Sequence, residues 1–278
     1  MAADLSVLIL TLNEEKNLER CLEAVRWSDD VIVFDSFSTD RTVEIARDWG
    51  ARVVQRKFDR EPVHRTASLH LGFKHRWVFN PDADEIATPE LAKEMLTVIE
   101  TCPPEIAAFR MRRKDMFMGR WIRHSSLYPT WLVRLFRPEA IRFERNINLR
   151  YLVTGPEDRL RHHLLHYSFN KGLDEWIAKH NRYSRAEAFE SLESLSAGEP
   201  DMAGLFSPDP VRRRRALKEE SFLLPFRPAW RFFYMYLMRL GICDGAPGFH
   251  YCCLLSFYEY MISIKTREIL AEKAGMTL

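Results

Sequence analysis

Short apolar runs alternate with amphipathic segments along the first hundred residues. Each run is rich in β-branched residues and short enough for one buried strand. Between the runs, apolar residues recur at helical spacing, over 18–25 and over 42–49, where Gly50 ends the second segment. This alternation predicts βαβ units, hence an α/β fold whose central sheet is mostly parallel and has helices on both faces. The runs that we predict as strands are residues 5–11, 31–35, 52–55 and 77–79.

Polar residues follow three of these predicted strands: Thr11–Glu14, Asp35–Asp40 and Asp82–Glu85. The carboxyl ends of parallel strands lie along one edge of a sheet, and such sheets bind their ligands there. We therefore expect the three segments to lie close together. Asn13 is also a candidate N-cap for the helix that follows it.

The regular alternation stops near residue 105. We expect a long amphipathic helix over 172–195 and a linker over 197–210, which is rich in Gly, Pro and Ser. Residues 221–262 hold twelve of the 34 aromatic residues. The chain is therefore predicted to consist of an alternating α/β part at 1–104, a second part at 105–200 and a helical, aromatic-rich C-terminal extension at 201–278.

Three carboxylates crowd into Asp82-Ala-Asp-Glu85. Like charges at such spacing repel, so a shared cation there is a reasonable expectation, and oxygen ligands suit Mg²⁺ or Mn²⁺. The alternative is a solvated acidic turn before the helix that begins at Thr88-Pro89. Asp35 could accept hydrogen bonds from a base or ribose. Arg65 could neutralise a phosphate or be an ordinary surface arginine.

Three ordered blocks carry a family resemblance: Leu5-Ser-Val-Leu-Ile-Leu-Thr-Leu-Asn-Glu-Glu15, Val33-Phe-Asp-Ser-Phe-Ser-Thr-Asp-Arg-Thr42 and Asp82-Ala-Asp-Glu85. Together they resemble the signature blocks of family 2 glycosyltransferases, in particular the bacterial lipopolysaccharide-core and exopolysaccharide transferases. Further segments similar to that subgroup are Arg134-Leu-Phe-Arg137, His166-Tyr-Ser168 and Gly241-Ile-Cys-Asp-Gly245.

The resemblance implies a GT-A fold that binds a nucleotide-diphosphate sugar and inverts the anomeric carbon, with the donor-binding half at 1–104 and the acceptor-binding half at 105–200. By analogy, Asp35 would contact the base, Asp82 would lie near the ribose and sugar, and Asp84 would bind a divalent metal (Mg²⁺ or Mn²⁺) on the diphosphate. His166 would complete the metal site, or else be a core histidine. The full set expected to bind substrate is Thr11, Leu12, Asn13, Glu14, Asp35, Arg65, Asp82, Ala83 and Glu85.

Inversion requires a carboxylate on the acceptor side to take the proton of the attacking hydroxyl. Many relatives carry a His-Glu pair after the basic segment, whereas the matching stretch here, Arg145-Asn-Ile-Asn-Leu-Arg150, has no acid. We name Asp158 and Glu144 as candidate catalytic bases, with Glu157 and Glu85 as further alternatives. The departure is also compatible with a different acceptor or with an inactive relative.

Charge is balanced overall, with 41 Lys and Arg against 39 Asp and Glu, but residues 110–150 carry a local net charge of +8. No nucleic-acid-binding motif accompanies this basic segment, so we expect no nucleic-acid partner. It is either a solvated surface or a site for a phosphorylated acceptor or anionic headgroups. Trp230 and its aromatic neighbours, preceded by Arg212–Arg215, resemble an interfacial helix, although packing against the protein is the alternative.

These features predict an inverting, metal-assisted glycosyltransferase that acts on a saccharide or lipid-linked, lipopolysaccharide-type acceptor. We expect it in the cytoplasm at the inner face of the membrane, with peripheral membrane contact, because no signal peptide or spanning segment is visible. The alternative is an inactive relative that binds nucleotide sugar or glycan. Nucleotidyl transfer is disfavoured, because Thr11–Lys16 contains no phosphate-binding glycine.

Overall fold

The computed structural model describes residues 4–144, 149–196, 202–205 and 226–276, and the chain divides into two compact units. Unit 1 consists of Met1–Trp121 and Leu127–Lys171, and unit 2 of Ile122–Ser126 and Gly172–Leu278. The assignment of donor and acceptor roles to 1–104 and 105–200 stays a prediction. Most of the expected linker and the whole of Arg212–Arg215 lie outside the described residues.

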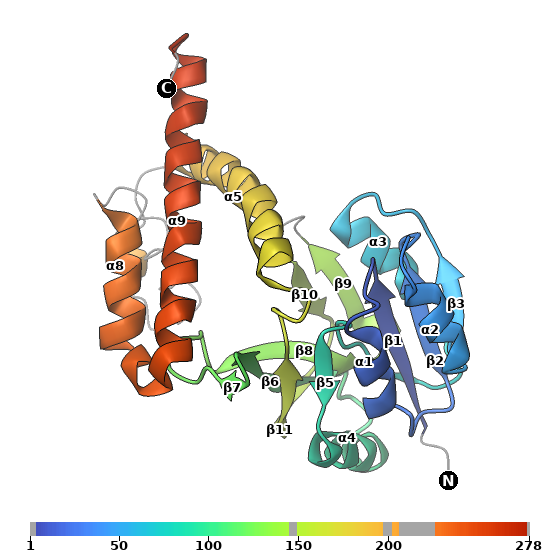
Figure 1. Ribbon diagram of the computed structural model, residues 1–278. Coiled ribbons are helices and arrows are strands. Elements are labelled where there is room, and N and C mark those ends of the chain that lie inside the picture. The colour runs from blue at the N-terminus through green and yellow to red at the C-terminus, as the bar shows by residue number, and fades with distance from the viewer. Residues whose placement is uncertain (1–3, 145–148, 197–201, 206–225, 277–278) are drawn as a thin grey trace. The chain divides into compact units, whose positions relative to one another are not determined.

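Unit 1 is built on a central sheet (Figure 1), which has nine strands among the described residues, in the order β3-β2-β1-β4-β8-β6-β11-β5, with β7 paired to β6. The helices of this unit are α1 (Leu18–Ala24), α2 (Thr42–Asp48), α3 (Glu61–Ser68), α4 (Pro89–Thr101) and a short 3-10 turn, η1 (Pro138–Ala140). Its strands are β1 (Leu5–Thr11), β2 (Val31–Asp35), β3 (Arg52–Gln55), β4 (Trp77–Phe79), β5 (Glu85–Ala87), β6 (Ala108–Phe117), β7 (Arg120–Trp121), β8 (Thr130–Phe136), β9 (Ile141–Glu144), β10 (Arg150–Val153) and β11 (Glu157–His166). The strands β9 and β10 form a separate antiparallel pair.

The first four strands confirm the predicted parallel βαβ arrangement, since β1 pairs in parallel with both β2 and β4, and β2 with β3. The second half makes the sheet mixed: β8 is antiparallel to β4 and β6, β11 is parallel to β6, and β5 is antiparallel to β11. Strand β5, which begins at Glu85 of the acidic segment, pairs with the last residues of β11 and so lies beside His166.

Apolar residues are buried on both faces of the sheet, as expected for a strand order flanked by helices. One core cluster packs α1, α2 and α4 against residues such as Val7 and Phe79. The other packs the region after α3, at Leu69, against Leu8 and Phe34. Helices therefore cover both faces, as predicted.

Strand β8 contains a bulge at Arg134. Leu135 pairs with Phe109 and Val133 pairs with Arg110, so Arg134 is the extra residue with no partner on β6. A bulge re-aims the side chain that it carries. A charged residue in the apolar strand TWLVRLF is thereby directed to a specific position instead of following the pleat.

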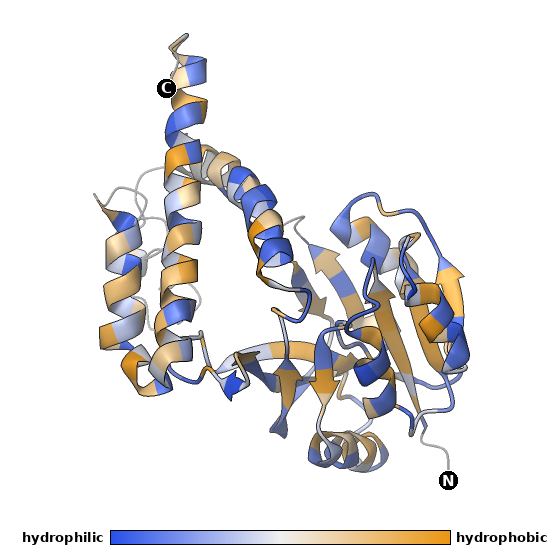
Figure 2. Cartoon of the chain, viewed as in Figure 1, coloured by the Kyte–Doolittle hydropathy of each residue, from blue (hydrophilic) through white to orange (hydrophobic). Residues whose placement is uncertain are grey.

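Unit 2 is helical, as predicted for the C-terminal extension. Its long helices, α5 (Leu173–Ser196) and α9 (Gly245–Lys273), share a small core made by Ala188, Leu192 and Ile269. Figure 2 shows hydrophobic residues over much of α8 and α9. No helix in the described part of the chain combines the length and apolarity that crossing a bilayer requires. The remaining elements are α6 (Met202–Leu205), α8 (Arg227–Phe233), the π-helical turn η2 (Tyr234–Met238) and the 3-10 turn η3 (Gly241–Asp244).

The motif Gly241–Gly245 holds the excursion Ile122–Ser126 inside unit 2. The buried carboxylate of Asp244 accepts hydrogen bonds from the amides of His124 (2.9 Å) and Ser125 (2.6 Å) and from the Ser125 hydroxyl (2.8 Å). A Cβ on Gly241 would lie 2.6 Å from the Met235 carbonyl oxygen, so only glycine permits this approach.

Leu91 of α4 tests the core of unit 1. Its side chain is fully buried, and its amide donates to the Thr88 N-cap hydroxyl at 3.2 Å. Leu91→Ala should lower the free energy of unfolding by about 2–5 kcal/mol, because it removes buried apolar surface and leaves a cavity. Leu127→Ala is the matched control, since Leu127 is 52% exposed and its truncation should change stability by less than about 0.5 kcal/mol. If urea unfolding gave the two variants equal losses in the free energy of unfolding, the buried position of Leu91 would be contradicted.

Candidate active site

Asp35 lies at the end of β2, directly beside Thr11 at the end of β1. Its fully buried carboxylate accepts hydrogen bonds from the Thr11 hydroxyl (3.0 Å), the Ser38 amide (2.9 Å) and the Gln55 side chain (2.9 Å). These partners satisfy a carboxylate that would be costly to bury alone. Asp35 thus fixes the ends of three neighbouring strands, and its contact with a nucleotide stays a prediction.

The loops after β1 and β2 are joined to each other. The Asn13 amide donates to the Ser38 hydroxyl (2.8 Å), and the Asn13 side-chain oxygen accepts from the Thr39 amide (2.8 Å). Asn13 and Phe37 both have positive φ, at 55° and 62°, a conformation that non-glycine residues hold only where the surroundings impose it. The predicted N-cap role of Asn13 is wrong, because its side chain links the two loops and α1 begins only at Leu18.

Glu14 is half-buried in the same loop, and Leu12 is exposed. Lys171 donates to the Glu14 carboxylate at 2.5 Å, and Asn17 donates to it at 2.8 Å. Burial raises the pKa of Glu14, although the hydrogen bonds from Lys171 and Asn17 oppose the rise. The negative charge of Asp84 raises this pKa further. The electrostatic influence of Asp84 links the Thr11–Glu14 loop to the acidic segment after β4.

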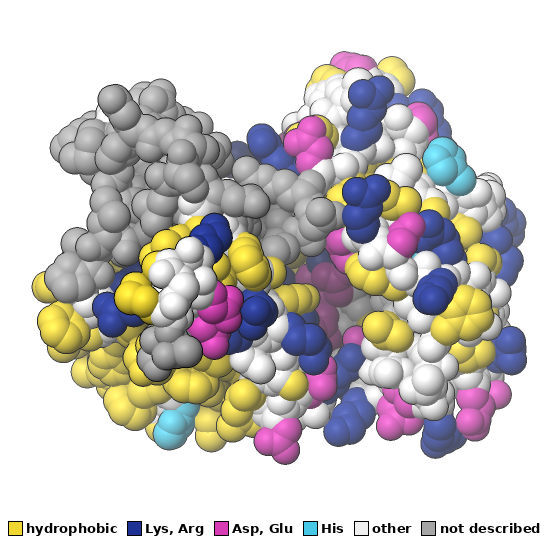
Figure 3. Space-filling model, turned by 90° about the horizontal axis from the view of Figure 1, so that it is seen from above, with side chains coloured by type: hydrophobic (Ala, Val, Ile, Leu, Met, Phe, Trp, Pro, Cys, Tyr) yellow, Lys and Arg dark blue, Asp and Glu magenta, His cyan; other side chains and the backbone are white. Residues whose placement is uncertain are grey.

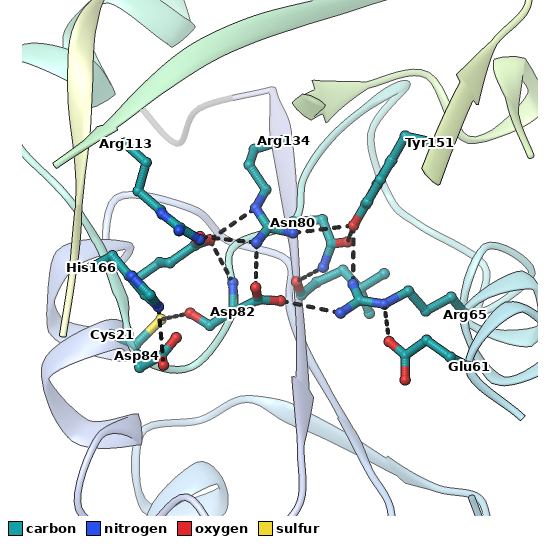
Figure 4. A network of polar contacts seen from close by, with 12 residues as sticks. Cys21, Glu61, Arg65, Asn80, Asp82, Asp84, Arg113, Arg134, Tyr151 and His166 are labelled. Carbon is teal, nitrogen blue, oxygen red and sulfur yellow. Dashed lines mark hydrogen bonds and ion pairs between the residues drawn. The ribbon is translucent and has the colours of Figure 1, made fainter. Parts of the chain in front are cut away.

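Two arginines neutralise two of the three crowded acids (Figure 4). Arg65 of α3 donates to Asp82 at 3.2 Å, and Arg134 donates to Asp82 and, at 2.9 Å, to the fully buried Glu85. Arg134 Nε also forms an ion pair with the other Glu85 oxygen, at 2.8 Å. Asp82 also donates its amide to Glu85 (3.0 Å). The repulsion expected from the sequence is therefore compensated at Asp82 and Glu85 by guanidinium groups of the chain itself.

The same contacts shift the ionisation of both carboxyl groups. Burial would raise the pKa of Asp82, but the charges of Arg134 and Arg65 outweigh it and hold that pKa well below its usual range. Burial dominates at Glu85 and raises its pKa, although Arg134 opposes the rise. Both arginines stay charged, since their acidic partners raise their pKa values despite burial.

Tyr151 of β10 closes this network. Its hydroxyl accepts from Arg65 (3.0 Å) and Arg134 (3.1 Å) and donates to the Asn80 side-chain oxygen at 3.2 Å. Asn80 in turn donates to the Leu8 carbonyl at 2.7 Å. The acidic segment is thus connected to α3, β8, β10 and β1.

Asp84 faces His166, as the resemblance implies for a metal pair. Asp84 Oδ2 lies 3.4 Å from His166 Nε2, and His166 Nδ1 donates to Asp115 Oδ1 at 2.7 Å. The strand pairing of Glu85 with His166 places these groups at one end of β5 and β11. Ala83, which lies between Asp82 and Asp84 in the sequence, is buried. The Asp82 carbonyl oxygen accepts a weak hydrogen bond from the Cys21 thiol, at 3.9 Å.

The Asp84–His166 pair fits a divalent cation. Asp115 holds the imidazole so that Nε2 points to Asp84, which is how a second carboxylate orients a metal-binding histidine. Burial would lower the pKa of His166, but Asp84 and Asp115 raise it to about 9, so without metal the two groups form an ion pair. No cluster of three His, Cys, Asp or Glu residues suited to a metal occurs among the described residues.

The structure does not bring Asp158 together with Asp84. Asp158 pairs with Phe109 and His166 pairs with Asp115, so six positions of β6 separate the two residues of β11, roughly 20 Å at about 3.3 Å per residue. Glu157, beside it, pairs with Arg110 at 2.5 Å.

Glu144 is exposed on β9. Its neighbour Phe143 pairs with Tyr151 across the two strands, so Glu144 points to the face opposite Tyr151. Of the four acids considered as bases, Glu85 is the one that shares the Asp82 network. The stretch Arg145–Asn148 lies outside the described residues.

Sequence reasoning missed the roles of Arg134, Tyr151, Asn80 and Asp115. Arg134 carried a usable signal, because an arginine within the apolar run of β8 must find a carboxylate partner if it is buried. Asp115 alternates with apolar Met111 and Phe109 along β6 and is similarly conspicuous. Tyr151 and Asn80 carry no such signal, since their partners come from distant segments.

Comparison with known proteins decides the family. The model of glycosyl transferase family 2 matches residues 6–156, more than half of the chain. The chain belongs to the family 2 glycosyltransferases. An uncharacterized glycosyltransferase of Rickettsia bellii is 27% identical to it over 279 residues, which cover 95% of this chain and 86% of the relative.

Two further proteins resemble this glycosyltransferase. The lipopolysaccharide core biosynthesis glycosyltransferase LpsC of Rhizobium meliloti is 27% identical over 199 residues, or 68% of this chain and 72% of LpsC. A mannosyltransferase of Pyrobaculum calidifontis, solved with GDP-Man and Mn²⁺, is 14% identical, covers 96% of this chain and 88% of its own, and has a TM-score of 0.52. The fold is therefore the GT-A fold, as the sequence predicted.

The pairing of Arg134 with Glu85 yields a test of the charge network of this glycosyltransferase. Arg134→Met should lower the free energy of unfolding by about 3–5 kcal/mol, because Glu85 is left as an uncompensated buried charge. Adding Glu85→Gln should recover part of that loss, since no buried carboxylate then needs a partner. Urea unfolding of the single and double variants measures both effects.

The loss in Arg134→Met should also depend on pH. The pKa of Glu85 is already raised in the folded protein, and removal of Arg134 raises it further. A raised carboxyl pKa contributes stability at low pH that is lost as pH rises through the folded-state value. The deficit relative to wild type should therefore be smaller near pH 5 than near about pH 8, and a deficit independent of pH would contradict the assignment.

Proposed function

We propose that this glycosyltransferase transfers a sugar from a nucleotide-diphosphate donor to a saccharide or lipid-linked acceptor of the lipopolysaccharide type, with inversion and with help from a divalent metal. The observation that carries the proposal is the Asp84–His166 pair, at 3.4 Å, close to the network of Asp82 and Arg134. Asp35 and Thr11 pair in register at the carboxyl ends of neighbouring parallel strands. Such strand ends are where α/β sheets bind nucleotides.

The roles follow the chemistry of each group. The joined loops at Thr11–Glu14 and Asp35 would contact the nucleoside, and Asp82 would lie near the ribose and sugar. Asp84 and His166 would hold Mg²⁺ or Mn²⁺, which when bound neutralises charge that develops on the leaving diphosphate. Arg65 is held by Asp82 and Glu61, so we assign it to the support of Asp82 instead of to a phosphate.

The acceptor class is supported by the likeness to LpsC, whose name places it in lipopolysaccharide core biosynthesis. Inversion rests on the family resemblance and needs a base near the acceptor hydroxyl. Since Glu144 and Asp158 do not lie with Asp84, a non-catalytic relative that binds nucleotide sugar is the second candidate. Acceptor-dependent release of nucleotide separates the two, because a binding protein does not turn over.

Peripheral membrane contact is part of the proposal. In Figure 3, hydrophobic side chains gather on the left, where α8 and α9 lie, with few charged groups among them. Residues 226–243 contain three arginines and no acid. Arg227 is buried and paired with Glu259 at 2.7 Å, whereas Arg231 and Arg239 are partly exposed and suit an anionic lipid surface. Large apolar side chains that are at least 40% exposed there are Phe226, Trp230, Phe233, Tyr234, Leu237, Met238, Leu240 and Ile242.

Asp84→Asn should abolish the metal-dependent part of donor binding, because the amide is a poor ligand for a hard cation. A thermal-shift titration of nucleotide sugars with and without Mn²⁺ measures this, since a ligand of the folded state raises its stability. Asp158→Asn is the matched control, and it should leave both donor binding and sugar transfer unchanged.

Metal-dependent binding that survives Asp84→Asn would refute the metal assignment. Loss of transfer in Asp158→Asn with donor binding intact would instead restore Asp158 as the base. Nucleotide release that never responds to any acceptor would favour the binding protein.

Trp230→Glu should reduce binding to phosphatidylglycerol vesicles at least several-fold, because it puts a charge into the apolar surface of α8. Trp49→Glu in α2 is the matched control: Trp49 is 40% exposed but belongs to unit 1, so the same charge there should not change vesicle binding. Flotation with vesicles measures both, and equal binding of the two variants would count against α8 as the contact.

A further inference from the structure

The strand β6 divides the basic segment between the two faces of the sheet. Arg113 points to one face, where it contacts Asp115 at 2.9 Å and lies 4.0 Å from Glu85. Arg112 and Lys114 point to the opposite face, since side chains alternate along a strand. The cations that compensate the acidic site are therefore separate from those on the other face.

Tryptophan rings support the cations on that second face. Trp131 of β8 pairs in register with Arg112, and the guanidinium carbons of Arg112 and Arg159 lie 5.3 and 5.0 Å from its ring centre. The Lys114 ammonium lies 4.5 Å from the ring centre of Trp121 in β7. Such contacts hold a cation in place by attraction to the ring and leave its charge without a counter-ion.

Carboxylates on this face are already paired elsewhere. Glu157 pairs with Arg110, and Glu94 pairs with His162. Among the residues that the structure describes, Arg112, Lys114 and Arg159 form no ion pair with an acid. The Arg112 Nε atom is buried without a hydrogen-bond partner. Arg112 Nη2 donates to the Arg161 carbonyl, which is a neutral partner. Three positive charges thus stand close together with no acid paired to them, and this arrangement favours an anionic ligand.

His163 lies among these cations and remains neutral. It pairs in register with Arg112, and its Nε2 is 3.0 Å from the Tyr128 hydroxyl. Burial and the charges of Lys114 and Arg112 lower its pKa to about 4. His163 and Tyr128 thus add neutral hydrogen-bonding groups to the site without adding charge.

We propose that Arg112, Lys114 and Arg159, held by Trp121 and Trp131, bind a phosphate group of the acceptor saccharide. Guanidinium and ammonium groups suit phosphate oxygens, and their fixed positions reduce the entropy lost on binding. The proposal rests on the glycosyl transfer proposed above. It deepens that function by assigning a phosphorylated saccharide as the acceptor class, while a phospholipid headgroup offers the same chemistry and is tested separately.

Lys114 of this cation set lies toward the carboxyl end of β6, and His166 of the proposed metal pair ends β11. Lys114 directly precedes Asp115, which contacts His166, and His163 lies three residues before His166 on β11. Of the residues that would bind the phosphate, Arg112 and Lys114 are therefore neighbours of the proposed metal pair along β6 and β11, but they lie on the opposite face of the sheet.

Equilibrium binding of glucose 6-phosphate to the full chain tests the proposal, with uridine or guanosine diphosphate present to fill the donor site. Lys114→Gln/Arg159→Gln should weaken binding about ten-fold and Lys114→Gln alone about three-fold, because each lost charge contributes under about 1 kcal/mol at such exposure. Lys93→Gln/Arg26→Gln is the matched control: both residues are exposed cations of unit 1, and the variant should bind like wild type. Glucose, without phosphate, should bind all proteins weakly.

Donor binding with Mn²⁺, measured on the same variants, should be unchanged, so that failure of the donor site is distinguished from failure of this one. Equal glucose 6-phosphate affinity in both double variants would overturn the proposal and leave a solvated basic surface. Binding of phosphatidylglycerol vesicles that is lost only in Lys114→Gln/Arg159→Gln, without any binding of the sugar phosphate, would overturn it in favour of a headgroup site.

Discussion

The charge balance around Asp82 and Glu85 is the constraint on which the site depends. Three carboxylates within four residues, at the end of a buried strand, are compatible with a folded chain only if cations accompany them. Arg134 and Arg65 supply that compensation for Asp82 and Glu85. Asp84 is consequently the acid that remains to face His166.

This balance depends in turn on backbone geometry. Arg134 is the bulged residue of β8, and Tyr151, which accepts from both arginines, comes from a different pair of strands. The network therefore unites segments from across unit 1. A change in the bulge would move the guanidinium away from Glu85, so the fold of the second half of the sheet and the ionisation of the acidic segment are coupled.

Local patterns predicted the first half of the sheet well. The four strands coincide with apolar runs bounded by polar residues, because burial on both faces leaves little freedom in where such a run begins or ends. Asp158 and Glu144 were chosen by nearness in sequence to the expected base, and their role stays a prediction. Nearness in sequence does not give nearness in space along a strand, since the β6 partners of Asp158 and His166 are six positions apart, roughly 20 Å. Partners such as Tyr151 could not be predicted, since they depend on long-range pairing.

The basic segment shows why net charge alone is a poor guide. Its local charge of +8 has at least two physical meanings, because alternation along β6 sends Arg113 to Asp115 and Glu85, and Arg112 and Lys114 to tryptophan rings. Cations of the first kind compensate the protein's own acids and are unavailable to a ligand. Those of the second kind form no ion pair with an acid among the described residues, so their charge is available to an anion from outside the chain.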